Sequence, residues 1–536
     1  MKRVIALILA LVTVLALVAC GGTGTTSGAT SGTTGKVDTD TIKDKQDENI
    51  HDVKEGVEYK DEVVIGIRVK VETTDIQAVS NVAHGYTFLM THEPLVHTNS
   101  DGKLIPKLAE SWTVSADAKT YTFKLREGVK FHDGSDFTAE DVIYTIQRGL
   151  DNPAASTTVK GLYGAFESFT AKDQYTVEIV LKEGDSDLLI AMANTGSFGI
   201  LSKKACEAAD DGYKYGTGPW ANDKFVIGDY MTLTRNDNYW GEKPVTKTVR
   251  FRVIPEDSAR LIALENKEID VCIYPANSEV QFVLDNQELD LVSYEGGLNY
   301  LFFNLDHAPF DDENFRLAIA NCIDVDAIIK GAKGGYGTRA LTTNAPYSFG
   351  FFADWASVGM TEYSRDLEKA KEYMAKSKYA SGAEFTITVN NNERALIAQI
   401  IQDQLKDIGV TVEVEQLDSA GFSAIQKEDG WEALIASIAY TAAGDDFGRS
   451  FKSNGGQNKM GYANAEVDAL FAKAKAEPDE AKRKEMYKDI QIIIHKEAPV
   501  TPLHYDVSFI AYTNKLSGVF WEGRGYHEFS YIKVEK

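Results

Sequence analysis

Hydrophobic and polar residues alternate over several short stretches of this chain. Residues 121–125 have apolar side chains at every second position, and they follow 112–114 and the polar run 115–119. This pattern predicts a β-hairpin with one buried face. The β-branched run at 62–69 predicts an earlier strand. Further strands are expected within 225–254 and over 269–273.

A longer unit combines both periods. Residues 385–389 and 410–414 alternate as strands do, and the segment 394–408 between them has an apolar stripe at helical spacing that ends at Gly409. A strand, a helix and a second strand in this order predict a βαβ unit and hence a parallel sheet. The stripe consists of Leu396, Ile397, Ile400, Ile401, Leu405 and Ile408.

Helix starts are also visible. Thr138 and Asp141 form the pattern of a capping box, with Val142, Ile146 and Leu150 following at helical spacing. Thr138 is therefore predicted to be an N-cap. Further amphipathic helices are expected after Pro255 and over 465–475 and 480–496.

The N-terminus has the pattern of a secretion signal. Two basic residues precede an apolar run at 4–19, which is shorter than the roughly 20 residues of a spanning helix. The run ends in Leu17-Val18-Ala19-Cys20-Gly21, which is typical of a lipoprotein cleavage site. We expect a signal peptide over 1–19 and a lipid on Cys20 that anchors the protein to the outer face of the cell membrane. An uncleaved anchor helix is the alternative, and it too places the bulk of the chain outside the cytoplasm.

A tether is expected to follow. Residues 21–35 contain only Gly, Thr, Ser and Ala, and a charged segment continues to residue 58. Such compositions bury too little apolar surface to offset the entropy of ordering. The flexible tether is therefore predicted over 20–58, with the first folded residue near Tyr59.

Charge limits the range of partners. The net charge of −24 becomes −26 once Lys2 and Arg3 leave with the signal. Such a surface repels nucleic acid and anionic lipid, so nucleic acid is not an expected partner. With 43% hydrophobic residues in 536, the chain is long enough for several cores, and we expect a monomer.

The remaining cysteines do not form a disulfide framework. Cys206, Cys272 and Cys322 are far apart and odd in number. We expect small buried apolar residues rather than metal ligands or nucleophiles.

Short motifs recur over nearly the whole mature chain. They are Glu93-Pro94-Leu95-Val96, Asp101-Gly102-Lys103-Leu104, Pro106 to Trp112, Tyr121 to Arg126, Gly128 to Gly134, Phe137 to Val142, Gly216 to Trp220, Arg235 to Trp240, Phe303-Asn304, Pro309 to Asp312, Arg316 to Ala320 and Gly461 to Asp468. Together they resemble the family 5 solute-binding proteins of ABC importers, the receptors for dipeptides, oligopeptides and nickel complexes. Most of these residues suit structural roles: a turn at 132–134, core positions at Trp112 and Phe123, and a capped turn at 236–238. The motifs thus identify the fold rather than the ligand.

The resemblance implies an α/β, two-lobe periplasmic-binding-protein-like fold (type II, cluster C) with an extra subdomain in the first lobe. It also implies an ATP-driven permease as partner, and neither cofactor nor enzymatic activity. The expected boundaries are lobe I over 59–98, 216–299 and 501–536, the extra subdomain over 99–215, and lobe II over 300–500. The chain would pass between lobes near 297–300 and 497–505.

A short peptide is the expected ligand, and its two charged ends need partners. An unpaired buried charge costs about 3 to 5 kcal/mol, so a receptor should supply an acid and a base. In the peptide-binding members an aspartate shortly after an aromatic residue pairs the amine. The corresponding stretch here has Tyr440 where those members carry tryptophan and Ala443 where they carry the aspartate, with Asp445 and Asp446 further on. Either aspartate could take that place, or both could be solvated loop acids.

Arg394 is the expected partner for the carboxylate. It begins the predicted helix, where unpaired N–H groups and the helix dipole favour an anion, and dipeptide binders carry an arginine close to this point. An exposed arginine near a helix start is the other reading. Tyr300 and Tyr440 could form aromatic walls of the site, or could belong to the core.

Two other classes of function remain. His84, His92 and His97 are spaced by eight and five residues, which does not suit a metal cage built by the protein. A metal chelate, above all of nickel, or another small solute such as an oligosaccharide or opine is the alternative ligand. The chain lacks G-x-S-x-G, P-loop and G-x-G-x-x-G patterns, which argues against an enzyme.

Overall fold

A computed structural model describes residues 50–78, 82–99, 103–193, 195–427, 430–440, 443–519 and 527–536. The expected signal peptide, Cys20 and most of the expected tether lie outside the described residues. The described end of that tether contacts the C-terminus: Lys54 Nζ lies 2.6 Å from Glu535 Oε1, and Lys536 N donates to Glu58 O at 2.9 Å. Within the described ranges, no helix has the length and hydropathy that crossing a membrane requires.

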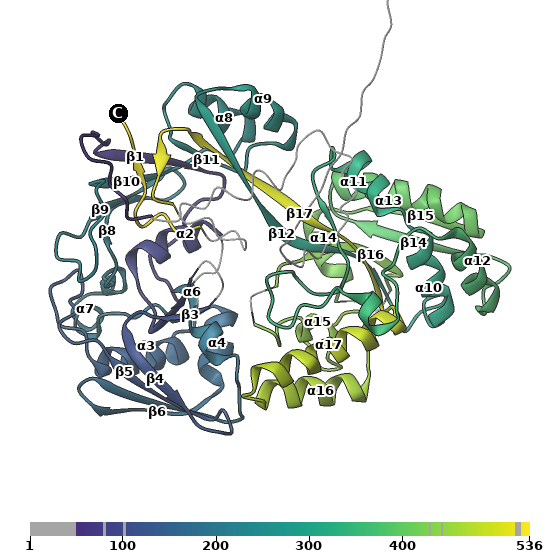
Figure 1. Ribbon diagram of the computed structural model, residues 1–536, viewed down its shortest axis with the longest axis horizontal. Coiled ribbons are helices and arrows are strands. Elements are labelled where there is room, and N and C mark those ends of the chain that lie inside the picture. Colours follow the sequence, from purple (N-terminus) through teal and green to yellow (C-terminus); the bar gives the residue numbers. More distant parts are fainter. Residues whose placement is uncertain are drawn as a thin grey trace, which may run out of the picture. The chain divides into compact units, whose positions relative to one another are not determined.

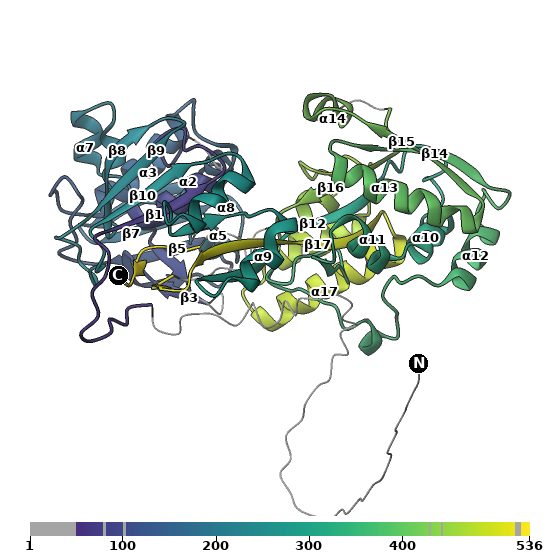
Figure 2. The same cartoon turned by 90° about the horizontal axis from the view of Figure 1, so that it is seen from above.

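The largest sheet of the structure contains both parallel and antiparallel strands (Figure 1). At its centre β12 (Leu289–Phe303) and β17 (Val500–Thr513) pair antiparallel. Figure 2 shows that these two strands continue from the group around β1 to the group around β14. Next to the pair lie β16 (Ala433–Ile438), β14 (Ala383–Val389) and β15 (Val410–Gln416) on one side, and β11 (Val271–Ile273), β1 (Glu62–Ile67), β10 (Thr248–Val253), β9 (Tyr230–Arg235) and β8 (Trp220–Val226) on the other. The short strand β13 (Thr338–Arg339) also pairs with β17.

The central pair is irregular where the chain was expected to pass between lobes. The register of β12 against β17 shifts between Glu295 and Leu298, at Gly296 and Gly297, and again between Asn299 and Tyr300. A side chain at residue 297 would have its Cβ 2.3 Å from Ser437 Oγ, so any larger residue here would force the Ser437 hydroxyl to move. The first shift places one extra residue in β12 and the second places one in β17, and such bulges bend a strand and increase its local twist.

The predicted βαβ unit is confirmed. β14 and β15 pair parallel from Ala383↔Val410 to Val389↔Gln416, joined by α13 (Asn392–Leu405). The helix begins two residues earlier than predicted, because the side chain of Asn391 accepts a hydrogen bond from Arg394 N at 2.8 Å and caps it. Leu396, predicted to lie on the buried stripe, is 41% exposed. A short 3-10 turn (Lys406–Ile408) follows, and Gly409 ends it with φ of 75°.

The predicted hairpin belongs to a separate antiparallel sheet. β4 (Ala109–Val114) pairs with β5 (Thr120–Leu125), which pairs with β7 (Thr176–Leu181) and then β6 (Phe166–Asp173). Phe123 is fully buried in a core that this part of the chain forms from its own residues. Burying a side chain of this size stabilises the fold by about 2 to 3 kcal/mol. The core explains why residues near 99–215 can form a compact addition to the main sheet.

The helix beside this sheet begins as predicted. Thr138 precedes α3 (Ala139–Asp151), and its backbone N–H donates to Asp141 Oδ2 at 2.9 Å. Val142 and Ile146 are buried, whereas Leu150 in the last turn is 38% exposed. The helices predicted later in the chain are α8 (Asp257–Glu265), α16 (Ala465–Ala476) and α17 (Glu480–Glu497).

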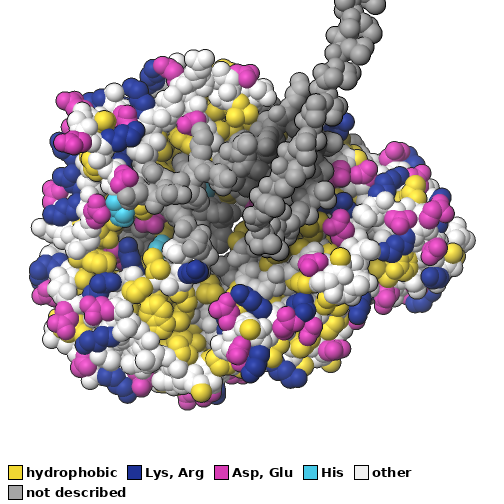
Figure 3. Space-filling model, in the orientation of Figure 1, with side chains coloured by type: hydrophobic (Ala, Val, Ile, Leu, Met, Phe, Trp, Pro, Cys, Tyr) yellow, Lys and Arg dark blue, Asp and Glu magenta, His cyan; other side chains and the backbone are white. Residues whose placement is uncertain are grey.

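The structure describes further helices. They are α2 (Val82–Thr91), α4 (Thr157–Gly164), α5 (Leu188–Met192), α6 (Thr195–Phe198), α7 (Lys203–Ala208), α9 (Val280–Asp285), α10 (Glu313–Cys322), α11 (Val325–Ala332), α12 (Leu367–Lys376), α14 (Ser419–Ile425) and α15 (Gly448–Phe451). On the face drawn in Figure 3, acidic and basic side chains are interspersed over the described residues.

A buried carboxylate connects the sequence motifs. Glu93, 1% exposed, accepts hydrogen bonds from Thr217 Oγ1 at 2.8 Å, Tyr239 OH at 2.7 Å and Trp240 Nε1 at 2.7 Å, and Lys107 Nζ lies 3.2 Å from it. Four motif segments are thus tied together at one point. This supports the structural interpretation of the motifs.

The three cysteines that the structure describes, Cys206, Cys272 and Cys322, are free. Cys272 and Cys322 are buried, as predicted, and Cys206 is half-buried. Burial is the main reason why the pKa of each of the Cys272 and Cys322 thiols lies above its usual range, which keeps both thiols protonated and unreactive.

Candidate functional site

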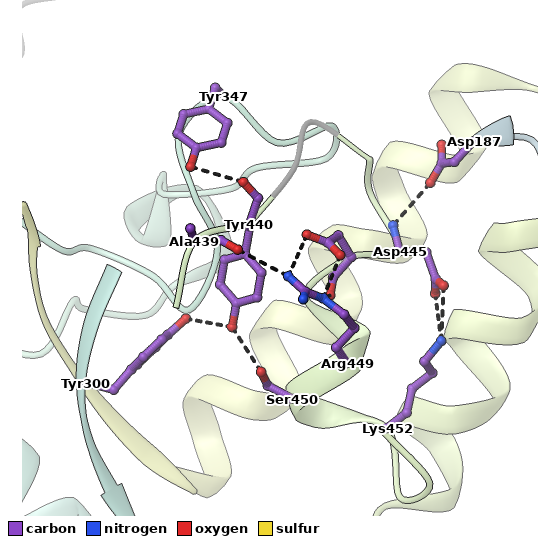
Figure 4. A network of polar contacts seen from close by, with 10 residues as sticks. Asp187, Tyr300, Tyr347, Ala439, Tyr440, Asp445, Arg449, Ser450 and Lys452 are labelled. Atoms are coloured by element: carbon purple, nitrogen blue, oxygen red, sulfur yellow. Dashed lines mark hydrogen bonds and ion pairs between the residues drawn. The ribbon is translucent and has the colours of Figure 1, made fainter. Parts of the chain in front are cut away.

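The loop that follows β16 carries both aspartates expected to bind an amine (Figure 4). Tyr440 comes two residues after the strand ends, Asp445 and Asp446 stand before α15, and Thr441 and Ala442 lie outside the described residues. We call residues 443–452 the acidic loop. Its two carboxylates contact different basic residues of the same loop.

Asp446 pairs with Arg449. The Nε atom lies 2.6 Å from Oδ1, and Nη2 donates to Oδ2 at 3.0 Å, so the guanidinium binds both oxygens. Arg449 Nη2 also donates to Ala439 O at 3.1 Å. The arginine therefore connects the acidic loop to the end of β16.

Asp445 pairs with Lys452, whose Nζ lies 3.0 Å from Oδ2. Burial raises the pKa of Asp445 above its usual range, and the Lys452 ammonium opposes this. The backbone N–H of Asp445 donates to Asp187 Oδ2 at 3.1 Å, as Figure 4 shows. Asp187 comes from the distant 99–215 segment, and nothing in the sequence pattern pointed to it.

The two tyrosines of the prediction meet beside the acidic loop. Tyr300 OH donates to Thr343 O at 2.8 Å and accepts from Tyr440 OH at 3.1 Å, and Tyr440 OH in turn accepts from Ser450 Oγ at 3.3 Å. Their rings are 0% and 4% exposed, so both tyrosines belong to a core cluster in this structure. Burial raises the pKa of Tyr440 to about 12, which keeps the hydroxyl protonated. Their contact with ligand stays a prediction.

Arg394 lies in a second polar cluster together with Lys333, Glu393, His504 and Asp506, and we call these five residues the basic cluster. Arg394 itself lies in the first turn of α13, and its Nη1 donates to Oδ1 of Asn390, which precedes the helix, at 2.7 Å. Burial lowers the pKa of Arg394, and the charges of Asp506 and Glu393 oppose this. Lys333, which is buried, bridges the same two acids: Nζ lies 2.8 Å from Glu393 Oε1 and 3.0 Å from Asp506 Oδ1.

Asp506 is the centre of the basic cluster. Burial works to raise its pKa, but the neighbouring His504 ring and the charge of Lys333 outweigh it and hold the pKa well below its usual range. His504 Nε2 lies 3.4 Å from Asp506 Oδ1, and the His504 side chain is fully buried. Because His504 and Asp506 are on β17, the cluster lies where the long central strands are irregular.

The structure thus places Asp445, Asp446, Tyr440 and Tyr300 in or beside the acidic loop, each with its own partners, and places Arg394 among other partners. Sequence reasoning missed Asp187, Lys333, His504 and Asp506. Lys333 stands in a glycine-rich run whose spacing did not suit phosphate binding. Single charged residues in strands or loops carry no periodic signal, so the other three could not be found that way.

The histidines are used in packing. His92 is fully buried between Thr91 Oγ1 at 2.9 Å and Tyr213 O at 3.0 Å, and burial lowers its pKa to about 3. His97 Nε2 lies 3.7 Å from Glu528 Oε2. The side chain of His84 lies outside the described residues. Among the residues that the structure describes, no group of three or more His, Cys, Asp or Glu is arranged to hold a metal ion.

Known proteins resemble this chain over most of its length. Residues 103–459 match the family described as bacterial extracellular solute-binding proteins, family 5 middle. The dipeptide-binding protein of Escherichia coli strain K12 is 27% identical over 473 residues, which cover 81% of this chain and 86% of that protein. The nickel-binding periplasmic protein of the same strain is 28% identical over 447 residues, covering 78% and 84% respectively.

A solved structure extends the similarity to the fold. The periplasmic binding protein DppA of Helicobacter pylori, in complex with the peptide STSA, is 27% identical and superposes with a TM-score of 0.73 over 89% of this chain and 99% of its own. The predicted periplasmic-binding-protein-like α/β fold is confirmed by this similarity.

Proposed function

The chain belongs to family 5 of the bacterial extracellular solute-binding proteins, and we propose that it captures short peptides and delivers them to the permease of an ABC importer. Members of this family are non-enzymatic receptors that act outside the cytoplasm. A peptide ligand is supported by the names of two relatives at 27% identity: one is a dipeptide-binding protein, and the other was solved with a bound peptide.

The acidic loop is the single observation that carries the proposal. Asp445 and Asp446 are 20% and 13% exposed, and each is paired with a cation from its own loop. A partly buried carboxylate needs such a partner, because its own desolvation is costly. A peptide ammonium can take the place of Lys452 beside Asp445, since the lysine side chain is long enough to turn into water.

Arg394 is the proposed partner of the peptide carboxylate. It lies in the first turn of α13, and the N–H groups at the start of a helix favour the binding of an anion. Lys333 adds a second positive charge nearby, which Glu393 and Asp506 balance. The two charged ends of an extended peptide would then be held by the acidic loop and the basic cluster.

Capture is proposed to involve closure of two lobes. Lobe I comprises 59–299 with 501–536, and lobe II comprises 300–500. A ligand shifts the balance toward the closed form only as far as it binds that form more tightly. The irregular stretch of β12 at Gly296 and Gly297 is the proposed place of bending.

Membrane attachment is proposed through Cys20. Two acyl chains, each contributing about 0.8 kcal/mol per buried methylene, would hold the domain at the membrane. Mass spectrometry of the mature N-terminus tests this: a diacylglycerol on Cys20 is expected. A mature chain that begins elsewhere without lipid would contradict it.

Calorimetric titration with modified dipeptides tests the ligand. Alanyl-alanine should bind, and both the N-acetylated and the C-amidated forms should bind at least about tenfold more weakly, because each lacks one charged end. Equal affinity for all three forms would contradict the proposed charge recognition. No binding of any peptide from two to five residues would overturn the peptide proposal.

A metal chelate is the second candidate, supported by the 28% identical nickel-binding relative. A chelate brings its own metal ligands, so the protein would not need to build a cage. Titration with a nickel–histidine complex, against nickel ion alone, separates this case. Tight binding of the complex with no binding of peptide would favour the chelate.

A further inference from the structure

The segment Asp185–Asp187 connects parts of the chain that are far apart in sequence. It follows β7 and leads into α5, yet Ser186 N donates to Lys475 O of α16 at 2.8 Å. Asp187 Oδ2 accepts from the N–H of Asp445, 258 residues later. The segment therefore contacts both α16 and the acidic loop.

Asp187 is the most deeply buried residue of the segment, with 4% of its surface exposed. Besides the N–H of Asp445 at 3.1 Å, its Oδ2 accepts from Tyr487 OH at 3.3 Å, and Arg483 Nε lies 3.7 Å from Oδ1. Arg483 is 7% exposed, so both charges of this pair are removed from water. A buried carboxylate in such a place requires the cation and the donors that surround it.

Asp185 anchors the segment on both sides. Its side chain lies 3.3 Å from Lys475 Nζ, and its carbonyl accepts from Tyr121 OH at 2.5 Å. Tyr121 is a buried residue of β5, so the segment is tied to the small sheet. Asp187 thus reaches the acidic loop from lobe I, while the loop belongs to lobe II, so this contact joins the two proposed lobes in the form that the structure shows.

The contact sets the position of Asp445 itself. Its N–H is held by Asp187 and its carboxylate by Lys452, at 3.1 Å and 3.0 Å respectively. Without Asp187 the N–H of a largely buried residue would lose its acceptor, and the backbone would be free to rotate away. Figure 4 shows Asp187 and Lys452 on opposite sides of Asp445.

We propose that Asp185–Asp187 is a positioning segment, which holds the acidic loop in the geometry that binds the ligand amine. Asp187 is then a positioning residue that never touches ligand, and the extra subdomain contributes to affinity through it. This inference rests on the proposed function, because it assigns a purpose to the loop that we propose binds the peptide. It gives the subdomain a role beyond packing.

The full mature chain with Asp187→Asn tests the proposal, since asparagine keeps the shape and removes the charge. Hydrogen exchange of amides 443–449 in the ligand-free protein should become about fivefold faster, because the asparagine oxygen still accepts the Asp445 N–H but lacks the charge that strengthens the bond. Alanyl-alanine should bind about tenfold more weakly, mainly through faster dissociation. Asp223→Asn, which alters an exposed aspartate of β8, should change neither quantity.

A charge exchange provides a second test that does not depend on how well the asparagine variant folds. Asp185→Lys and Lys475→Asp should each weaken dipeptide binding severalfold, and the double variant should restore it to within about twofold. A double variant no better than the single ones would overturn the charge pairing.

The two proposals fail in different ways. Unchanged exchange in Asp187→Asn would overturn the positioning role even if peptides bind. A wild-type protein that binds no peptide would overturn the proposed function, while faster exchange of 443–449 would still support the positioning of the loop.

Discussion

The carboxylate of Asp187 accepts a hydrogen bond from the backbone N–H of Asp445, although the two residues lie 258 positions apart. One belongs to the addition built around its own small sheet, and the other to the loop after β16. Their contact means that a substitution at Asp187 can alter the position of the acidic loop, which we propose binds the ligand. Several consequences can be measured.

Asp445→Ala together with Asp446→Ala should weaken alanyl-alanine binding at least about tenfold, because the peptide ammonium would lose both carboxylates. Calorimetric titration measures this. The loss should be much smaller for the N-acetylated dipeptide, which has no ammonium to pair.

Asp403→Ala is the matched control for this pair. Asp403 is an exposed acid on α13 that contacts Lys406 at 3.1 Å. It should leave dipeptide affinity unchanged. Unchanged titrations of the double alanine variant would refute the amine role of both aspartates.

Arg394→Ala should weaken binding of dipeptides with a free carboxylate about tenfold and leave the C-amidated form unaffected, since only the former offers an anion to the guanidinium. Parallel titrations of the two ligands give the comparison, with the exposed Lys406→Ala as control. If the variant loses both ligands equally, Arg394 supports the fold of α13 and does not recognise the carboxylate.

Glu93→Gln should lower the free energy of unfolding by about 3 to 5 kcal/mol, because Lys107 would lose the carboxylate that lies 3.2 Å from its Nζ and a buried network would keep one charge. Urea denaturation followed by tryptophan fluorescence measures this. Glu110→Gln, an exposed residue of β4, should have an effect within about 0.5 kcal/mol. Equal stability of the two variants would show that Glu93 does not hold the motifs together.

His495 should make stability depend on pH. Its ring lies 4.1 Å from those of Trp355 and Tyr363, and burial lowers its pKa from 6.5 to about 4. A group with a depressed pKa contributes stability that is complete above pH 6.5 and is lost as pH falls toward 4. The full loss is about 3 kcal/mol, at roughly 1.4 kcal/mol for each pH unit.

Thermal and urea unfolding between pH 7 and pH 4 can measure this contribution. His495→Gln should flatten the curve relative to wild type, because glutamine does not titrate. A variant whose stability falls as steeply as that of wild type would contradict the assignment to His495. The other buried histidines, such as His92, contribute the same trend and remain in both proteins.

Some features of this fold follow from local sequence alone. The period-two stretches 385–389 and 410–414 form paired parallel strands, because alternation places their apolar side chains on one face. Thr138 is an N-cap, because the capping-box residues satisfy backbone groups at the helix start. Even there, neighbouring residues decided the boundaries. Asn391 captures the N–H of Arg394, so α13 begins before the arginine that the stripe had suggested.

The tertiary structure decided which single charges meet. A single charged residue in a loop, in a strand or at a helix end has no periodicity that could indicate its partner. Examples are the contacts of Asp187 with Asp445 and of Lys333 with Asp506. Their pairing depends on how a continuous sheet brings distant segments together, which is a cooperative property of the whole core. The motifs that reveal the family therefore mark packing around Glu93, while the charges around the proposed ligand are set by contacts that only the folded chain makes.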